Sequence, residues 1–184
     1  GSGDSSGGAG GTVSFDTNST TIVLADTAIS TGGGTKVNGG TDGAGGTITI
    51  SDPLSITTGA VSLDTGSTAG GVTISSTIDG SVDLDISSGT GAVAIQDAIG
   101  GSTALATLDI NATSGTGTIE VEDVGNASSG VTGLTRIGQS NTSSLTLDGS
   151  VYKFGGGFTF GGDYSASVQT FTTSGAVNIL GDVT

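Results

Sequence analysis

Pairs of acidic residues separated by a single apolar residue are the positions in this sequence most able to do chemistry. Asp83 and Asp85 are separated by one leucine, and Glu120 and Glu122 by one valine. Because successive side chains of a β-strand point to opposite faces, each pair would project from one face of its strand. Carboxylate oxygens are the ligands that Ca²⁺ prefers. The pairs are therefore candidate calcium ligands.

Two further acidic residues extend this hypothesis. Asp97 and Asp123 occupy equivalent places in two similar segments, 88–98 and 114–124, and in a stack of coils with that repeat one would lie above the other. A calcium ion could then bridge adjacent coils. The simpler interpretation is an acidic outer face that keeps the protein in solution and its strand edges apart. The nine-residue motif of calcium-binding β-rolls does not recur, since its nearest match is 39–43. We expect no cofactor, with Ca²⁺ as the one open alternative.

Aromatic residues are concentrated late in the chain. Six of the seven lie between residues 152 and 171. Phe158 and Phe160 fall in register with the apolar positions, which predicts that they belong to the core. Tyr152 and Tyr164 are the candidates for a surface that docks a sugar or a protein, because aromatic rings dominate contact energies.

Composition excludes several classes of function. The chain has 17 acidic and 3 basic residues, no His and no Cys, and a net charge of −14. The negative electrostatic potential of such a chain repels nucleic acid and anionic membrane surfaces. No apolar stretch approaches the ~20 residues that span a bilayer. No basic segment followed by an apolar one opens the sequence, so we expect no signal peptide in it. No basic residue accompanies the acidic pairs to stabilise an anionic intermediate, so we expect a protein that is not an enzyme.

An internal repeat predicts the elements that position these side chains. Residues 88–98 read Ser-Gly-Thr-Gly-Ala-Val-Ala-Ile-Gln-Asp-Ala, and residues 114–124 read Ser-Gly-Thr-Gly-Thr-Ile-Glu-Val-Glu-Asp-Val. Each segment reads as a turn followed by a strand of alternating apolar and polar residues. The unit that begins at position 88 therefore begins again at position 114. A repeat of this length is typical of a solenoid.

The same pattern can be followed along the chain as two strands per coil. The strands that open a coil are predicted at 13–15, 48–50, 72–74, 93–95, 119–121 and 145–147, with a looser candidate at 168–171. The second strands are predicted at 22–24, 61–63, 82–86, 105–110, 158–160 and 177–179, with a weaker one at 134–137. Parallel stacking explains why the same residue class returns at the same position. The pattern predicts an all-β parallel β-helix (β-solenoid) of about seven coils of 21–26 residues, with a β-sandwich as the alternative.

Glycine-rich segments mark the domain boundaries. Residues 1–11 are predicted to be a flexible Gly/Ser linker, and residues 12–184 the β-solenoid domain. Within that domain, residues 31–46 hold a single sizeable apolar residue, Val37. They are predicted to form a Gly-rich loop that protrudes from the rod.

Part of the chain resembles a known class of repeat. The segments that carry the resemblance are Gly-Gly-Ser-Thr-Ala-Leu-Ala-Thr-Leu-Asp-Ile-Asn-Ala (100–112), Gly-Leu-Thr-Arg-Ile-Gly (133–138) and Leu-Thr-Leu-Asp-Gly-Ser-Val-Tyr (145–152). They are similar to the repeat regions of giant filamentous-haemagglutinin-like bacterial surface proteins, which are adhesins. The resemblance covers about half of the chain and implies a right-handed β-helix exported to the cell surface. It supplies no functional residues.

These observations lead to one expected function and one alternative. We expect a non-enzymatic structural or adhesive segment of a large exported bacterial surface protein or filament, outside the cell. Neither end carries a polar cap, so the partners expected are flanking repeats or other copies of the chain, stacked end to end. A host or partner cell surface, or a glycan, is a further expected partner. The alternative is a surface module that binds Ca²⁺ or a glycan.

Overall fold

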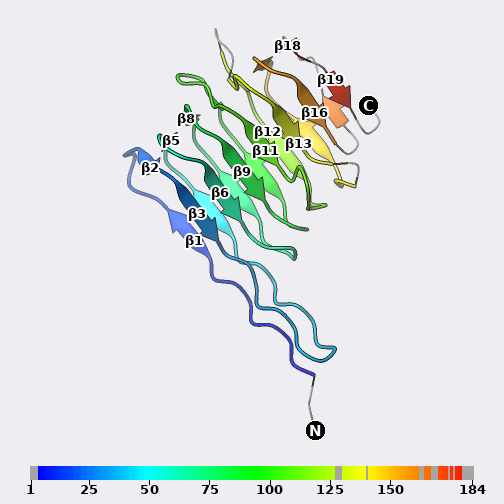
Figure 1. Ribbon diagram of the computed structural model, residues 1–184. Helices are drawn as coiled ribbons and strands as arrows, with labels where there is room; N and C mark the ends of the chain where they lie inside the picture. The colour runs from blue at the N-terminus through cyan, green and yellow to red at the C-terminus, as the bar shows by residue number, and fades with distance from the viewer. Residues whose placement is uncertain are drawn as a thin grey trace.

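The computed structural model describes residues 4–126, 130–139, 141–161, 164–166, 170–173, 175 and 177–179, with the backbone alone in 164–166, 170–172 and 177–179. Within these ranges the chain forms nineteen short β-strands and no helix (Figure 1). Accordingly, no helix of the described part is long and apolar enough to cross a membrane.

The strands stack into three parallel sheets, so the fold is an all-β parallel β-solenoid. The first sheet contains, in order, β1 (Val13–Phe15), β4 (Ile48–Ile50), β7 (Val72–Ile74), β10 (Val93–Ile95), β12 (Ile119–Val121), β14 (Leu145–Leu147) and β17 (Tyr164–Ala166). The second sheet contains β3 (Thr27–Ser30), β6 (Val61–Asp64), β9 (Leu84–Ser87), β11 (Leu108–Ile110), β13 (Thr135–Ile137), β16 (Phe158–Phe160) and β19 (Val177–Ile179). Every pairing between these strands is parallel, which rules out a sandwich of antiparallel hairpins.

The third sheet is continuous at one end of the solenoid and sparse in the middle. It begins with β2 (Ile22–Leu24), β5 (Leu54–Ile56) and β8 (Ile78–Gly80), and it ends with β15 (Val151–Phe154) paired to β18 (Thr170–Thr173). Between these two parts the sheet continues only as isolated parallel bridges, from Ile78 to Ile99, from Ile99 to Val124 and from Val124 to Tyr152.

The register of the first sheet confirms the predicted coil starts. Ile48 pairs with Val72, Val72 with Val93, Val93 with Ile119, and Ile119 with Leu145. The looser candidate at 168–171 is wrong. Leu145 pairs instead with Tyr164, which precedes that segment, and the described part of 168–171 belongs to β18 in the third sheet. Val168 itself lies outside the described residues.

The third sheet was not predicted as a separate element. The strand at 22–24 was assigned to the second position of a coil, yet it pairs with β5 in the third sheet, and β3 takes the predicted position. Between β8 and β15 the third sheet continues only through single bridges. No alternating strand therefore recurs at this position in every coil, and the repeat does not reveal the sheet.

Inward side chains of all three sheets fill the interior. Along each strand the apolar residues alternate with polar ones, and in β4, β7 and β9 every inward side chain is wholly buried. Many of them are Ile or Val, whose branched side chains pack well on a pleated surface. The outward positions hold mainly Thr, Ser, Asp and Glu, so most of the polar and charged side chains lie on the surface.

A glycine-rich extension, which we call the glycine flap, lies beside the first coils. It consists of residues 4–12 and 31–46, which leave the three-sheet body together near the N-terminus (Figure 1). Its N–H groups donate to a neighbouring segment at every third residue, from Gly7 to Thr41 and from Gly10 to Ala44, and Val13 of β1 continues the series to Thr47. Three residues per turn is the period of polyproline II, which makes no internal hydrogen bonds. In the flap these backbone groups bond to the neighbouring segment instead. A Cβ on Gly43 would overlap the carbonyl oxygen of Gly8, so glycine is required where these segments touch.

Candidate functional site

Acidic residues of the first sheet are crowded together on its outer face. Glu120 lies in β12 opposite Thr146 of β14, and Glu122 follows at the strand end. Burial, and then the neighbouring Asp148, raises the pKa of Glu120. Burial, and then Asp123, Asp148, Glu120 and Asp97, raises the pKa of Glu122. The geometry therefore gathers carboxylates at one place, where each makes its neighbours harder to ionise.

The second sheet carries a separate row of charged residues across its coils. Asp85, Asp109 and Arg136 are consecutive partners in β9, β11 and β13. Arg136 donates from Nε to Oδ1 of Asp109 at 2.7 Å and from Nη2 to Oδ2 of the same residue, so the ion pair is bidentate. Burial, and then Asp109, raises the pKa of Asp85. The Asp109–Arg136 pair was missed because the two residues are far apart in sequence and share no motif.

The remaining acidic candidates accept hydrogen bonds from their own or a neighbouring coil. Asp83 Oδ1 accepts from the hydroxyl of Thr107 at 2.7 Å. Asp97 Oδ1 accepts from the N–H of the next residue at 2.7 Å. Asp123 Oδ1 accepts from the N–H groups of Ser150 at 2.6 Å and Val151 at 2.8 Å. These bonds give each of the three carboxylates a structural role.

The register between Asp97 and Asp123 is not the simple stack that the sequence predicts. Ile95 pairs with Val121 before the two aspartates, and Ile99 pairs with Val124 after them. The turn that holds Asp123 is therefore one residue shorter than the turn that holds Asp97. Among the residues that the structure describes, no three acidic side chains are grouped so that they could hold a metal ion. The calcium site stays a prediction.

The aromatic end of the solenoid is mostly interior. Phe158 and Phe160 are buried, as predicted, with ring centroids 4.7 Å apart. Tyr152 is wholly buried too, which corrects the expectation that its side chain lies at the surface. Its hydroxyl donates to the carbonyl of Val121 and accepts from the N–H of Gly149, both at 2.9 Å. Tyrosine can be a core residue where its hydroxyl finds partners. The side chain of Tyr164 lies outside the described residues.

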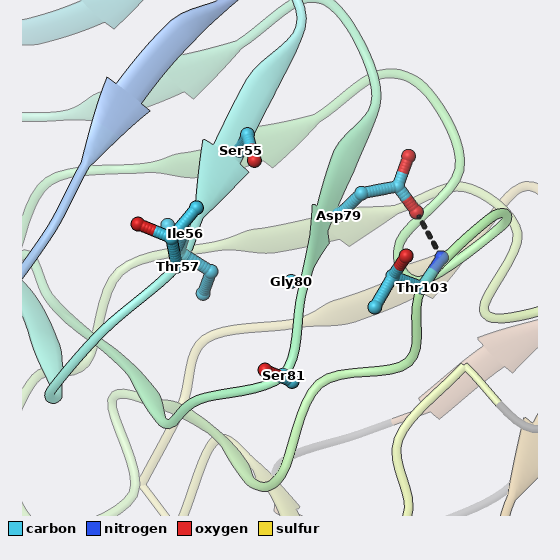
Figure 2. A pocket seen from close by; sticks show the side chains of 7 residues that line it. All are labelled: Ser55, Ile56, Thr57, Asp79, Gly80, Ser81 and Thr103. Atoms are coloured by element: carbon cyan, nitrogen blue, oxygen red, sulfur yellow. Dashed lines mark hydrogen bonds between the residues drawn. The ribbon is translucent and has the colours of Figure 1, made fainter.

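A small cavity opens on the third sheet, where its continuous part ends (Figure 2). Its volume is about 200 Å³, and it is lined by Ser55, Ile56, Thr57, Asp79, Gly80, Ser81 and Thr103. Beyond β8 the sheet continues only through the bridge from Ile78 to Ile99. The chain then turns at Gly100, with a φ of 65°, and Gly80 at the end of β8 donates its N–H to the carbonyl of Thr103. The cavity thus lies beside the interruption of the sheet.

Asp79 is the charged group of this cavity. Its Oδ1 accepts from the N–H groups of Ser102 at 2.8 Å and Thr103 at 2.9 Å, the second of which is drawn in Figure 2. Among the residues that the structure describes, no donor reaches its other oxygen, Oδ2. The aspartate therefore anchors the turn with one oxygen and leaves the second for a ligand.

Glycine is required at position 80, beside the cavity, because a Cβ there would overlap the carbonyl oxygen of Ile56 on the neighbouring strand. Ile56 and Gly80 are both buried, so the accessible lining consists of Asp79 and the hydroxyl-bearing residues around it (Figure 2). Sequence reasoning missed this site because it missed the third sheet, which alone brings Ser55 opposite Asp79.

Comparisons of the chain with protein-family models, with curated proteins and with solved structures found no match. Of the resemblance seen in the sequence, the parallel β-solenoid fold is confirmed by the strand pairings.

Proposed function

We propose that the protein is a non-enzymatic, structural or adhesive segment of a large exported bacterial surface protein or filament, similar to the repeats of filamentous-haemagglutinin-like adhesins. The observation that carries the proposal is the uninterrupted stacking of the first and second sheets, in which every described neighbour is parallel and in chain order. Such a stack adds length one coil at a time, because each coil contacts only its neighbours. The interior is apolar and the outer face small and polar, which suits a spacer.

The finer architecture belongs to the same proposal. Seven coils are supported by the seven strands in each of the first and second sheets. A right-handed coil is supported by the general preference of crossovers between parallel strands, which are right-handed in about 98% of cases.

The open edge of the first coil supports end-to-end association. Among the described strands, β1, β2 and β3 each pair with a neighbour on one side only. Val13 donates to Thr47, and Phe15 accepts from Ser51, both toward the second coil. In a parallel ladder the residue between them directs its N–H and C=O the opposite way, so Ser14 offers both groups to a strand from another molecule. Val23 of β2, with 61% of its surface exposed, adds an apolar contact at the same end.

The test of association is a proline at this edge. Ser14→Pro removes the outward N–H and leaves the bonds of Val13 and Phe15 to the second coil in place. We expect the unaltered chain to form species larger than a monomer in sedimentation or light scattering at high concentration, and the variant to stay monomeric.

The matched control is Ser14→Ala, which retains the N–H and should associate like the unaltered chain. A chain that stays monomeric at high concentration would refute self-association. Equal association of the proline variant would show that the N-terminal edge is not the contact.

A further inference from the structure

The carboxylate of Asp79 carries a charge that nothing nearby neutralises. The chain has three basic residues. Arg136 is paired with Asp109, Lys153 donates to the backbone carbonyl of Asn126, and Lys36 lies in the glycine flap. Among the described residues, therefore, no cation of the chain is paired with Asp79. An aspartate with one oxygen free is a favourable partner for a positive group from outside.

The size of the cavity limits what can enter it. Sites for whole small molecules have volumes of ~300–1,000 Å³. This one has about 200 Å³, which suits a single side chain. A partner protein that inserts one residue fits this volume better than a free ligand does.

The walls favour a planar cation with several donors. Arginine carries five N–H groups and a flat guanidinium that stacks on planar surfaces, and it is less strongly hydrated than lysine. Asp79 Oδ2 can accept one of these donors, and the hydroxyls of Ser55, Ser81 and Thr103 at the rim can accept others (Figure 2).

We propose that this cavity receives an arginine side chain of a basic partner polypeptide. The net charge of −14 attracts such a partner from a distance, and the cavity then selects where it docks. This interaction is independent of end-to-end association, because the cavity lies on the side of the solenoid and not at the edge of its first coil.

The test uses N-acetyl-arginine amide as the probe and amide chemical shifts of the isotope-labelled protein as the readout. We expect saturable shifts centred on Gly80, Ser81 and Thr103. The neutral citrulline analogue, which has the same shape without the charge, should give none. Asp79→Asn keeps an oxygen for the N–H groups of Ser102 and Thr103 and removes the charge. It should weaken binding about tenfold or more, as loss of a hydrogen bond to a charged group does.

The matched control variant is Asp123→Asn. Asp123 also accepts two backbone N–H groups of the next coil through Oδ1, and its substitution changes the net charge equally. Binding should be unchanged in this variant. Ser55→Lys provides a second test, because it places an ammonium opposite Asp79 and should block the probe without touching the turn.

Three results would overturn the proposal. Absence of saturable shifts would mean that the cavity takes no arginine. Equal shifts from citrulline, or from methyl glucoside as a neutral polyol, would indicate a site without charge selectivity. Equal weakening by Asp79→Asn and Asp123→Asn would assign the binding to the overall negative field rather than to the cavity.

Discussion

Small polar side chains inside the solenoid hold the corners where the second sheet ends. Their hydroxyls donate to a backbone carbonyl of the chain that leaves the corner, from Thr31 to Gly46 at 2.9 Å, from Thr65 to Gly70 at 2.5 Å and from Ser88 to Gly91 at 2.8 Å. In the next coil the amide of Asn111 donates to Ser88 Oγ and accepts from its N–H. Hydrogen bonding offsets the cost of burying these groups.

Thr135 is the exception among the described residues, because its Oγ1 is buried without a hydrogen-bond partner. It occupies an inward position of the second sheet between Leu108 and Phe158. Thr135→Val replaces the hydroxyl by a methyl group of similar size. We expect the free energy of unfolding to rise by about 1 kcal/mol, since an unsatisfied polar group is removed. Chemical denaturation measures the change.

The same substitution at Thr65 is the control. Thr65 is equally buried, but its hydroxyl is bonded, so Thr65→Val should lower the free energy of unfolding by about 1–3 kcal/mol. If both variants changed stability in the same direction, the assignment of Thr135 as unsatisfied would be wrong.

At the scale of elements, the strands and the glycine flap differ in whether there is room for side chains. In the strands the side chains point to the two faces of the sheet, and the outward rows hold mainly Thr, Ser, Asp and Glu. The flap brings backbones into direct contact, so only glycine fits at Gly7, Gly10, Gly43 and Gly46. In contrast, a Cβ on Gly8 would meet nothing within 4 Å. The flap thus contains glycines that packing requires and glycines that it does not.

Gly43→Ala and Gly8→Ala test this distinction. The first places a methyl group on the carbonyl oxygen of Gly8, and it should lower the hydrogen-exchange protection of flap amides about tenfold or more. The second should change protection little, within about 0.5 kcal/mol, as substitutions into open surroundings do. The amides of β7 and β10 provide the internal reference, since neither residue contacts them. Equal effects of the two variants would mean that the flap segments are not in contact.

The molecule as a whole is an acidic rod in which carboxylates are crowded at a few places. Asp85, Glu120 and Glu122 have raised pKa values, first because of burial and then because of neighbouring carboxylates. Asp52 has a lowered pKa, chiefly because the backbone N–H of Thr17 donates to it. Protonation of Asp85, Glu120 and Glu122 therefore stabilises the folded state. For Asp52 it is the ionised form that does so.

Stability should therefore pass through a maximum as the pH falls. A raised pKa means that the folded protein takes up protons before the unfolded chain does, so the free energy of unfolding should rise from pH 7 toward the ordinary values of 4.5 for Glu and 3.8 for Asp. Below 3.8 the contribution of Asp52 is lost as it is protonated through its lowered pKa. The thermal midpoint, followed by circular dichroism from pH 7 to pH 3, measures this course. Glu122→Gln should flatten the rise, and a midpoint that falls steadily from pH 7 would contradict it.

Much of the fold could be predicted because its signals are local and recur. Ile48, Val72, Val93, Ile119 and Leu145 open strands with a period of two after a turn, and each pairs with the next in the structure. The candidate site could not be predicted in this way. Asp79 looks like any surface aspartate until the third sheet places it opposite Ser55. Tyr152 was assigned to the surface because nothing in the sequence shows that Val121 and Gly149 meet its hydroxyl.

By itself, then, the sequence determined a stack of short parallel strands with an apolar interior and an acidic surface. Repetition of the same residue class at a nearly constant offset requires such stacking. The tertiary structure alone decided the third sheet, the packing of the glycine flap and the cavity at Asp79. These features arise where coils differ from one another in length, as at Gly100, where the third sheet is interrupted. Their physical cause is the contact of residues from different coils, which a periodic pattern does not encode.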